Sequence, residues 1–111
     1  MPRRMSKTSR DKIMAQLQED PQALGPQLGL IAMKYSIPVR SYAIWLDVTE
    51  ECVRRWFYGT SRPREAEVKT IKRLLVILRR ALLAHEFPLV GSYTSRVQQM
   101  DAIVRRHASI R

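Results

Sequence analysis

Apolar residues recur at helical spacing along most of the chain, and prolines and glycines divide this pattern into short segments. Proline does not fit inside a helix, and the residue before it is pushed out of helical backbone. The spacing between these breaks predicts helices over residues 9–19, 39–46, 50–57, 64–85 and 94–108. A further helix is expected before the turn at residues 36–38, with a start at Asp20-Pro21 and a second candidate start at Gly25-Pro26. No segment alternates apolar and polar residues as a half-buried strand does. The expected fold class is therefore all-α, a small helical domain with a long C-terminal helix and a final helix.

The 111 residues suffice for one domain, in which pattern and charge mark three regions. Residues 1–12 form a basic N-terminal arm with five basic residues and one acidic residue. Residues 13–63 contain the short helices, and residues 64–111 contain the long helix and the final helix. Apolar residues make up 45% of the chain, but domains of this size bury only roughly 60–70% of the surface that the unfolded chain exposes. A partner subunit would therefore add stability.

The chain is strongly basic, with 20 Lys and Arg against ten Asp and Glu and a formal net charge of +10. Because each phosphate that a cation neutralises releases a condensed counterion, this charge favours a polyanionic partner. Basicity alone leaves DNA, RNA and an anionic membrane surface open. The charge is also uneven, since residues 13–53 carry −3 whereas residues 54–64 carry +4 with no acid.

The sequence lacks the features of several classes of protein. A single cysteine, Cys52, leaves no internal disulfide and suits a reducing compartment. The basic start is not followed by an apolar run, and the longest such run, residues 74–78, is too short to cross a membrane. His85 and His107 have no carboxylate or cysteine at metal-ligand spacing, and no nucleophile–base pair, glycine-rich phosphate loop or acid pair suggests catalysis. We therefore expect a cytoplasmic protein that is not an enzyme and has no metal, cofactor or small-molecule ligand.

The stretch over residues 39–58 has the pattern of two short helices joined by a tight turn. Two helices that cross steeply need a small residue at the crossing, and Ala43 provides it. The turn needs a residue that tolerates left-handed backbone, which Asp47 does. Thr49 is a strong N-cap for the second helix, and acids directly after a cap complement the helix dipole. The remaining inward positions are apolar: Leu46, Val48, Val53 and Trp56.

This stretch resembles the helix-turn-helix of the lambda-repressor-like family, the Cro and Xre type of phage and bacterial regulators. The resemblance rests on the small, apolar and capping positions just described, on the apolar Tyr42, and on an exit that runs from Gly59 to Pro63. It extends back to residues 28–38, where the family has its first helix, so it covers about residues 28–63. The chain differs from the family in having Asp47 where glycine is commoner, and one long helix after Pro63 where the family has two short ones.

The resemblance implies a sequence-specific transcriptional regulator, bacterial or phage-encoded, that binds double-stranded DNA at the nucleoid and represses as a homodimer on a palindromic operator. In this family the second short helix enters the major groove. The residues placed to read bases are Glu50, Glu51, Arg54 and Arg55. The residues placed near the DNA backbone are Arg40, Ser41, Thr60, Ser61, Arg62 and Arg64. The basic arm offers further contacts from Arg3, Arg4, Lys7 and Arg10, the alternative being a solvated tail.

The long helix carries a heptad-like apolar stripe that predicts a dimer interface. Its members are Val68, Ile71, Leu75, Leu78 and Leu82. The final helix has its own apolar side, formed by Val97, Met100, Ile103 and Val104. This side can cover the stripe within the same chain, which is the alternative to a dimer.

Three alternatives to these functional roles stay open. Glu50 and Glu51 suit a role limited to the start of their helix as well as they suit base readout. The protein can also be an adaptor or anti-activator that binds another protein, with the helix-turn-helix serving only as a packing unit. The third alternative is an architectural protein that binds DNA or RNA with low specificity.

Overall fold

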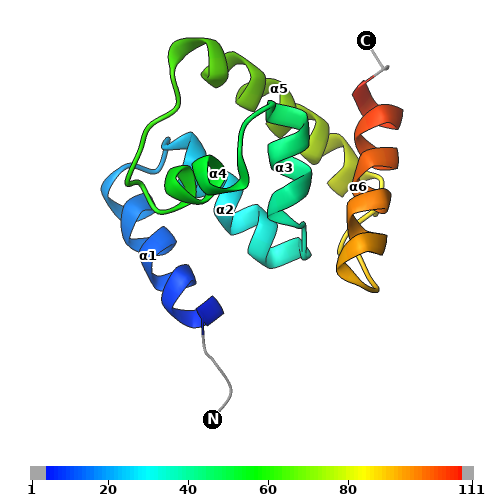
Figure 1. Cartoon of the computed structure of the whole chain (residues 1–111), viewed down its shortest axis with the longest axis horizontal. Coiled ribbons are helices and arrows are strands. Elements are labelled where there is room, and N and C mark those ends of the chain that lie inside the picture. The colour runs from blue at the N-terminus through cyan, green and yellow to red at the C-terminus, as the bar shows by residue number, and fades with distance from the viewer. Residues whose placement is uncertain (1–4, 109–111) are drawn as a thin grey trace.

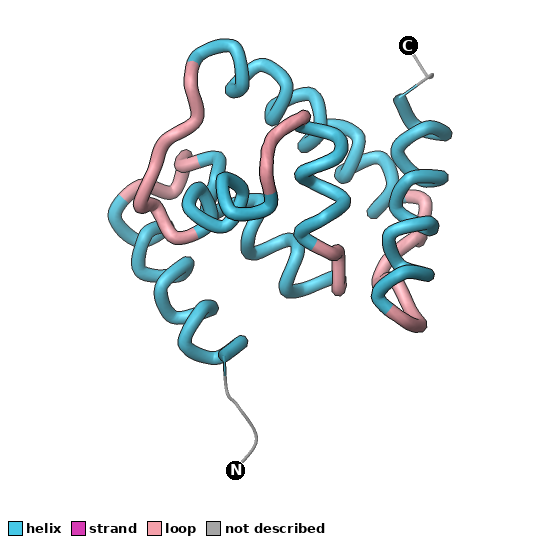
Figure 2. The backbone as a smooth tube through the Cα atoms, viewed as in Figure 1, coloured by secondary structure: helices cyan, strands magenta, loops and turns pink. Residues whose placement is uncertain are grey.

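The computed structural model describes the backbone of residues 5–108 and the side chains of residues 10–108 (Figure 1). The described chain is helical and contains no strand, so the all-α expectation is confirmed. The helices are α1 (Met5–Glu19), α2 (Leu24–Tyr35), α3 (Val39–Leu46), α4 (Glu50–Phe57), α5 (Glu65–Leu83) and α6 (Tyr93–Ala108). Figure 2 shows short connections between the first four helices and longer loops on either side of α5. No helix within residues 5–108 combines the length and apolar character needed to cross a membrane.

The helix boundaries follow the predicted breaks except at the N-terminus. Helices α3 and α4 have the predicted bounds, and α5 and α6 differ by one or two residues at their ends. Helix α1 begins at Met5 and not at residue 9, so residues 5–12 belong to the first helix and do not form a separate arm. The physical reason is composition, because this segment holds no glycine or proline and its Lys and Arg residues are good helix formers.

Left-handed residues end α2 and α3. Ser36 has φ 62° and Asp47 has φ 56°, both in the left-handed region. These turns let the N–H of Ile37 donate to the carbonyl of Ala32 at 3.0 Å, and the N–H of Val48 donate to the carbonyl of Ala43 at 3.1 Å. The prediction that Asp47 supports the turn between the two short helices is therefore confirmed.

Helix α2 packs against α1, α4 and α5, and close approach at two glycines makes the contact with α4 possible. A Cβ atom added at Gly25 would lie 2.3 Å from the backbone oxygen of Trp56. One added at Gly29 would lie 2.9 Å from a methyl carbon of Ile13 and 3.0 Å from the ring of Phe57. Only glycine allows helices to come this close. The pair α3–α4 is thereby held against the N-terminal helices.

The inward positions of the helix-turn-helix form part of the main core, as predicted. Tyr42, Ala43, Leu46, Val53 and Trp56 are buried, and Val48 is half-buried against them. The Tyr42 hydroxyl donates to the carbonyl of Leu28 at 3.1 Å. Burial removes this phenol from water, which disfavours the charged form and raises the pKa of Tyr42 above its ordinary value.

The prediction that the apolar stripe on α5 forms a dimer interface is wrong in part. Ile71 and Leu78 are buried inside the single chain, Val68 and Leu75 are half-buried, and only Leu82 is exposed. The face of α5 that enters the core is instead Ile71, Leu74, Ile77, Leu78 and Ala81. The helix repeats every 3.6 residues, so a face centred on these positions is rotated away from the heptad stripe.

Helix α6 fills the other side of this core. Met100, Ile103 and Val104 are buried and Val97 is half-buried, so the last helix covers α5 from within the same chain. That result agrees with the alternative to the dimer stripe. Apolar side chains that stay exposed in this half are Val76, Leu82, Leu83 and Val90.

Candidate nucleic-acid interface

Helix α4 is amphipathic, and its two faces have different partners. Val53, Trp56 and Phe57 point into the core. The Thr49 hydroxyl oxygen accepts the N–H of Cys52 at 3.1 Å, which caps the helix as predicted. The side chains expected to read bases, Glu50, Glu51, Arg54 and Arg55, all lie on the outer face, well exposed to solvent.

The charges on this outer face are paired within the helix. Arg54 Nη2 lies 3.4 Å from Glu50 Oε1, and Arg55 Nη2 lies 2.9 Å from Glu51 Oε2. Both pairs join residues four apart, with the acid on the N-terminal side, which is the favourable orientation on a helix. Exposed pairs of this kind contribute only about 0.3–0.5 kcal/mol each. Either arginine can therefore leave its glutamate for another anion at little cost.

The loop after α4 keeps two of the predicted backbone-binding arginines at the surface. Arg62 and Arg64 are exposed, and the N–H of Arg64 donates to Glu67 Oε1 at 2.7 Å, which starts α5. The Thr60 hydroxyl donates to the carbonyl of Arg55 at 3.2 Å. Thr60 is exposed and Ser61 half-buried. The loop therefore presents arginine side chains as its main polar groups for an anion.

Ser41 does not belong to the site. Its side chain is buried with 2% exposure, and its hydroxyl has no hydrogen-bond partner among the described residues. The prediction that Ser41 contacts DNA is wrong, because its position in the first turn of α3 faces the core. Arg40, one residue earlier, is exposed and remains available.

Only part of the predicted N-terminal contact region can be placed. Arg3 and Arg4 lie outside the described residues, as does the side chain of Lys7, whereas Arg10 is exposed in α1. The Lys12 ammonium lies 5.7 Å from the centroid of the Tyr58 ring, directly after α4. Helix α1 thus passes beside the end of the candidate reading helix.

The start of α6 lies against the start of α3, which the sequence did not predict. The N–H of Arg40 donates to the Tyr93 hydroxyl oxygen at 3.4 Å. Arg96 Nη1 donates to the carbonyl of Ser36 at 3.0 Å, and the Arg96 guanidinium carbon lies 5.7 Å from the centroid of the Tyr93 ring. The partners in these two hydrogen bonds are 53 and 60 residues apart in the sequence, so no local sequence pattern predicts the contact.

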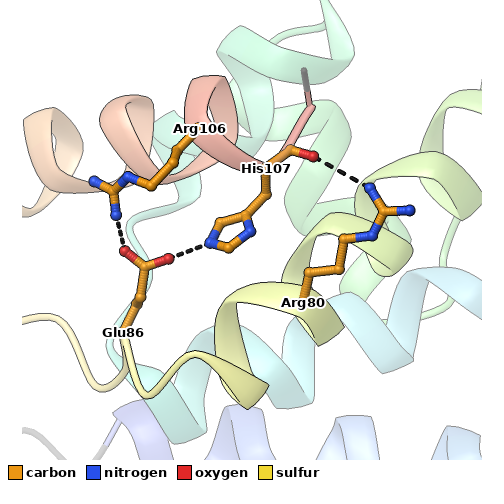
Figure 3. Close-up of polar contacts among 4 residues, drawn as sticks. All are labelled: Arg80, Glu86, Arg106 and His107. Atoms are coloured by element: carbon orange, nitrogen blue, oxygen red, sulfur yellow. Dashed lines mark hydrogen bonds and ion pairs between the residues drawn. The ribbon is translucent and has the colours of Figure 1, made fainter. Parts of the chain in front are cut away.

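The other end of α6 is fixed by a partly buried polar cluster (Figure 3). The Glu86 carboxylate, which follows α5, contacts both the Arg106 guanidinium and His107 Nε2. Arg80 Nη1 donates to the carbonyl of His107 at 3.3 Å. Sequence analysis assigned no role to His107, whereas in the structure its contacts join α5, α6 and the loop between them. His85 is exposed.

Among the residues with described side chains, no three histidines, cysteines or acids gather as metal ligands would. No family model, curated protein or solved structure matches the chain. What this protein does must therefore be inferred from the geometry and charge described above.

Proposed function

We propose that this protein is a sequence-specific transcriptional regulator that binds double-stranded DNA through α4. The observation that carries the proposal is the pair α3–α4, joined by the left-handed Asp47, with α4 capped by Thr49 and charged along its whole outer face. Two short helices in this arrangement place the second helix in the major groove of DNA. The net charge of +10 supports a polyanionic partner.

The chemistry of the outer face of α4 suits base edges. Arg54 and Arg55 can each donate two hydrogen bonds to guanine O6 and N7, and Glu50 or Glu51 can accept from the cytosine amino group. The i,i+4 pairs join these side chains on the outer surface of the helix and are weak enough to open when DNA binds. The exposed Arg40, Arg62 and Arg64 would then neutralise backbone phosphates on either side.

The regulator would act as a repressor, as a homodimer on a palindromic operator at the bacterial nucleoid. One reading helix contacts few bases, so proteins of this kind use two across half-sites about 34–36 Å apart. Since Ile71 and Leu78 are buried, the dimer would use the exposed apolar side chains Val76, Leu82, Leu83 and Val90. Sedimentation at micromolar concentration tests this arrangement, and a single species at the chain mass of 13.0 kDa would contradict it.

Selection of bound sequences from a pool of random duplexes tests the proposed function. We expect a recurrent half-site repeated with two-fold symmetry. Arg55→Ala should lose preference at one or two base positions, with a loss of about 1–3 kcal/mol in binding, because it removes a base contact. Arg62→Ala is the matched control and should weaken all sequences alike, because it removes a phosphate contact.

Two outcomes would contradict this assignment. If the two variants show the same uniform loss, α4 is not the reading helix. If no sequence is enriched although duplexes are bound, the low-specificity architectural role replaces the regulator.

One feature favours a second candidate, the protein-binding adaptor. A groove of about 200 Å³ lies between α2 and α5 and is apolar along most of its length. Its lining includes Ile31, Tyr35, Leu75, Leu82, Phe87 and the charged Arg79. An apolar groove with a cation suits an amphipathic helix that carries acids. Regulation that survives replacement of both Arg54 and Arg55 by alanine would favour this candidate over DNA reading.

A further inference from the structure

The first turns of α3 and α6 form one surface, although 53 residues separate Arg40 from Tyr93. Figure 1 shows the start of α6 beside the start of α3. Arg96 Nη1 donates a hydrogen bond to the carbonyl of Ser36, in the turn before α3, and the Tyr93 hydroxyl oxygen accepts one from the N–H of Arg40. Helix α6 is therefore positioned against the helix-turn-helix by two hydrogen bonds from side chains at its own start.

The cations on this surface have no acid partner. In the described part of the chain the ion pairs involve Glu50, Glu51, Glu86 and Asp101, and none of these contacts Arg40 or Arg96. By contrast, two arginines near the C-terminal end of α6 have acid partners, because Arg105 pairs with Asp101 and Arg106 pairs with Glu86. The positive charge of α6 is thus neutralised at its end and left uncompensated at its start.

The remaining donors of this surface are arranged for an anion. A guanidinium has five N–H donors, and Arg96 uses one of its nitrogens on Ser36, so the rest of its fork is free. The Tyr93 ring below the guanidinium limits its rotation. The Tyr93 oxygen accepts from Arg40 and keeps its own O–H proton for an acceptor outside the protein, and the side chain is 44% exposed.

We propose that Arg40, Tyr93 and Arg96 together bind a phosphate of the DNA backbone, so that α6 extends the DNA-binding surface beyond the helix-turn-helix. Arginine forks bind phosphate with two charge-assisted hydrogen bonds, and a tyrosine hydroxyl supplies a third donor. This inference rests on the proposed function and adds a contact from a part of the chain outside the motif. It assigns a role to the last helix besides its place in the core.

The test is the salt dependence of DNA binding, measured on one selected duplex and on a scrambled one between 50 and 200 mM salt. Each phosphate contact contributes about 0.9 to the slope of log K against log salt. Because Arg40 stays beside the same phosphate, Arg96→Ala should lower the magnitude of this slope by up to about 0.9 per bound chain and weaken both duplexes alike. The matched control is Arg105→Ala, on the same helix but paired with Asp101, which should leave the slope unchanged.

The slope separates phosphate binding from a structural role of Arg96. Arg96→Lys keeps the charge but loses the guanidinium fork, so it should retain the slope even if it loosens the contact with Ser36. The inference is overturned if the slope measured for Arg96→Ala equals the wild-type slope. It is also overturned if Arg105→Ala lowers the slope by as much as Arg96→Ala does. If Arg62→Ala lowers the slope and Arg96→Ala does not, the proposed function stands without this contact. If the wild type shows no salt-dependent binding to duplex DNA, the proposed function fails first.

Discussion

The two halves of this molecule are shaped by contacts of different range. In the half that holds α3 and α4, the cap from Thr49 to Cys52 spans three residues, and the pair from Glu51 to Arg55 spans four. In the half that holds α5 and α6, Glu86 meets His107 across 21 residues, and Arg80 meets it across 27. The first half is therefore shaped mainly by its own short segments, and the second half by how distant segments pack.

The polar contacts of the two halves also differ in how far their side chains are exposed to solvent. The side chain of Glu51 is 71% exposed, so water screens its pair with Arg55. The side chain of Glu86 is 16% exposed and that of His107 is 9% exposed. Removing one partner from a buried polar contact leaves the other without water to replace it. The same substitution should therefore have different effects in the two halves.

The largest expected effect tests a tight long-range contact of the first half, the approach of Gly25 to the backbone of Trp56. In Gly25→Ala the new Cβ would lie 2.3 Å from a backbone oxygen, and backbone cannot move aside as a flexible side chain can. We expect a loss of about 3 kcal/mol in the free energy of unfolding, at the upper end of the range for overpacked sites. Denaturation by urea, followed by circular dichroism, measures it.

Gly29→Ala is the matched control in the same helix. Its new Cβ would meet the end of the Ile13 side chain, which can shift by rotation, and Phe57 Cγ and Cβ at 3.0 and 3.1 Å, a milder overlap than that at Gly25. We expect a clearly smaller loss of stability than for Gly25→Ala. Equal losses would mean that α2 and α4 separate easily, and that the first half does not depend on this close approach.

The two halves also differ in how much of their structure could be predicted from the sequence, and the first half was predicted in more detail. The cap at Thr49, the left-handed turn at Asp47 and the inward Val53 and Trp56 were predicted, because each requirement involves only neighbouring residues. The outer face of α4 was also placed, since helical spacing alone decides which side chains share it.

The second half was predicted only as helices. Helix α5 has apolar residues on several faces, including Leu74, Val76 and Leu83, so spacing alone does not select the buried one. Packing of α2, α3 and α6 against α5 selects it, and buries Ile71 and Leu78 in place of a dimer seam. The contacts of Arg96 and Glu86 were missed for the same reason, because they depend on where α6 lies against distant segments.

A second prediction compares the same substitution in the two halves. Glu86→Ala should lower the free energy of unfolding by about 1.5–3 kcal/mol, because it leaves the buried His107 ring nitrogen without its carboxylate partner. The Arg106 guanidinium is 55% exposed and can turn to water, so it adds little to this loss. Glu51→Ala should cost about 0.3–0.5 kcal/mol, the value of an exposed pair four residues apart. Both are measured by urea denaturation at neutral pH. A loss for Glu51→Ala as large as that for Glu86→Ala would remove the proposed difference between the halves.

The last prediction expects a smaller loss than Gly25→Ala or Glu86→Ala and concerns Tyr42, whose hydrogen bond to Leu28 spans 14 residues within the first half. Tyr42→Phe should cost about 1 kcal/mol at neutral pH, the value of one hydrogen bond. Burial raises the pKa of Tyr42, so the folded chain keeps this proton while the unfolded chain loses it near the ordinary pKa of about 10. The contribution of Tyr42 is therefore complete below about pH 10 and falls as pH rises further, by up to about 1.4 kcal/mol per pH unit.

The measurement is urea unfolding of the wild type and of Tyr42→Phe between pH 8 and pH 11, since the difference between the two curves isolates this one phenol from other groups that titrate there. We expect the wild type to be the more stable protein at pH 8 and to lose that advantage as pH rises above about 10. Curves that stay parallel over the whole range would show that Tyr42 ionises equally in both states. Its hydroxyl would then be open to water, and the contact between α2 and α3 would be looser than the 3.1 Å hydrogen bond implies.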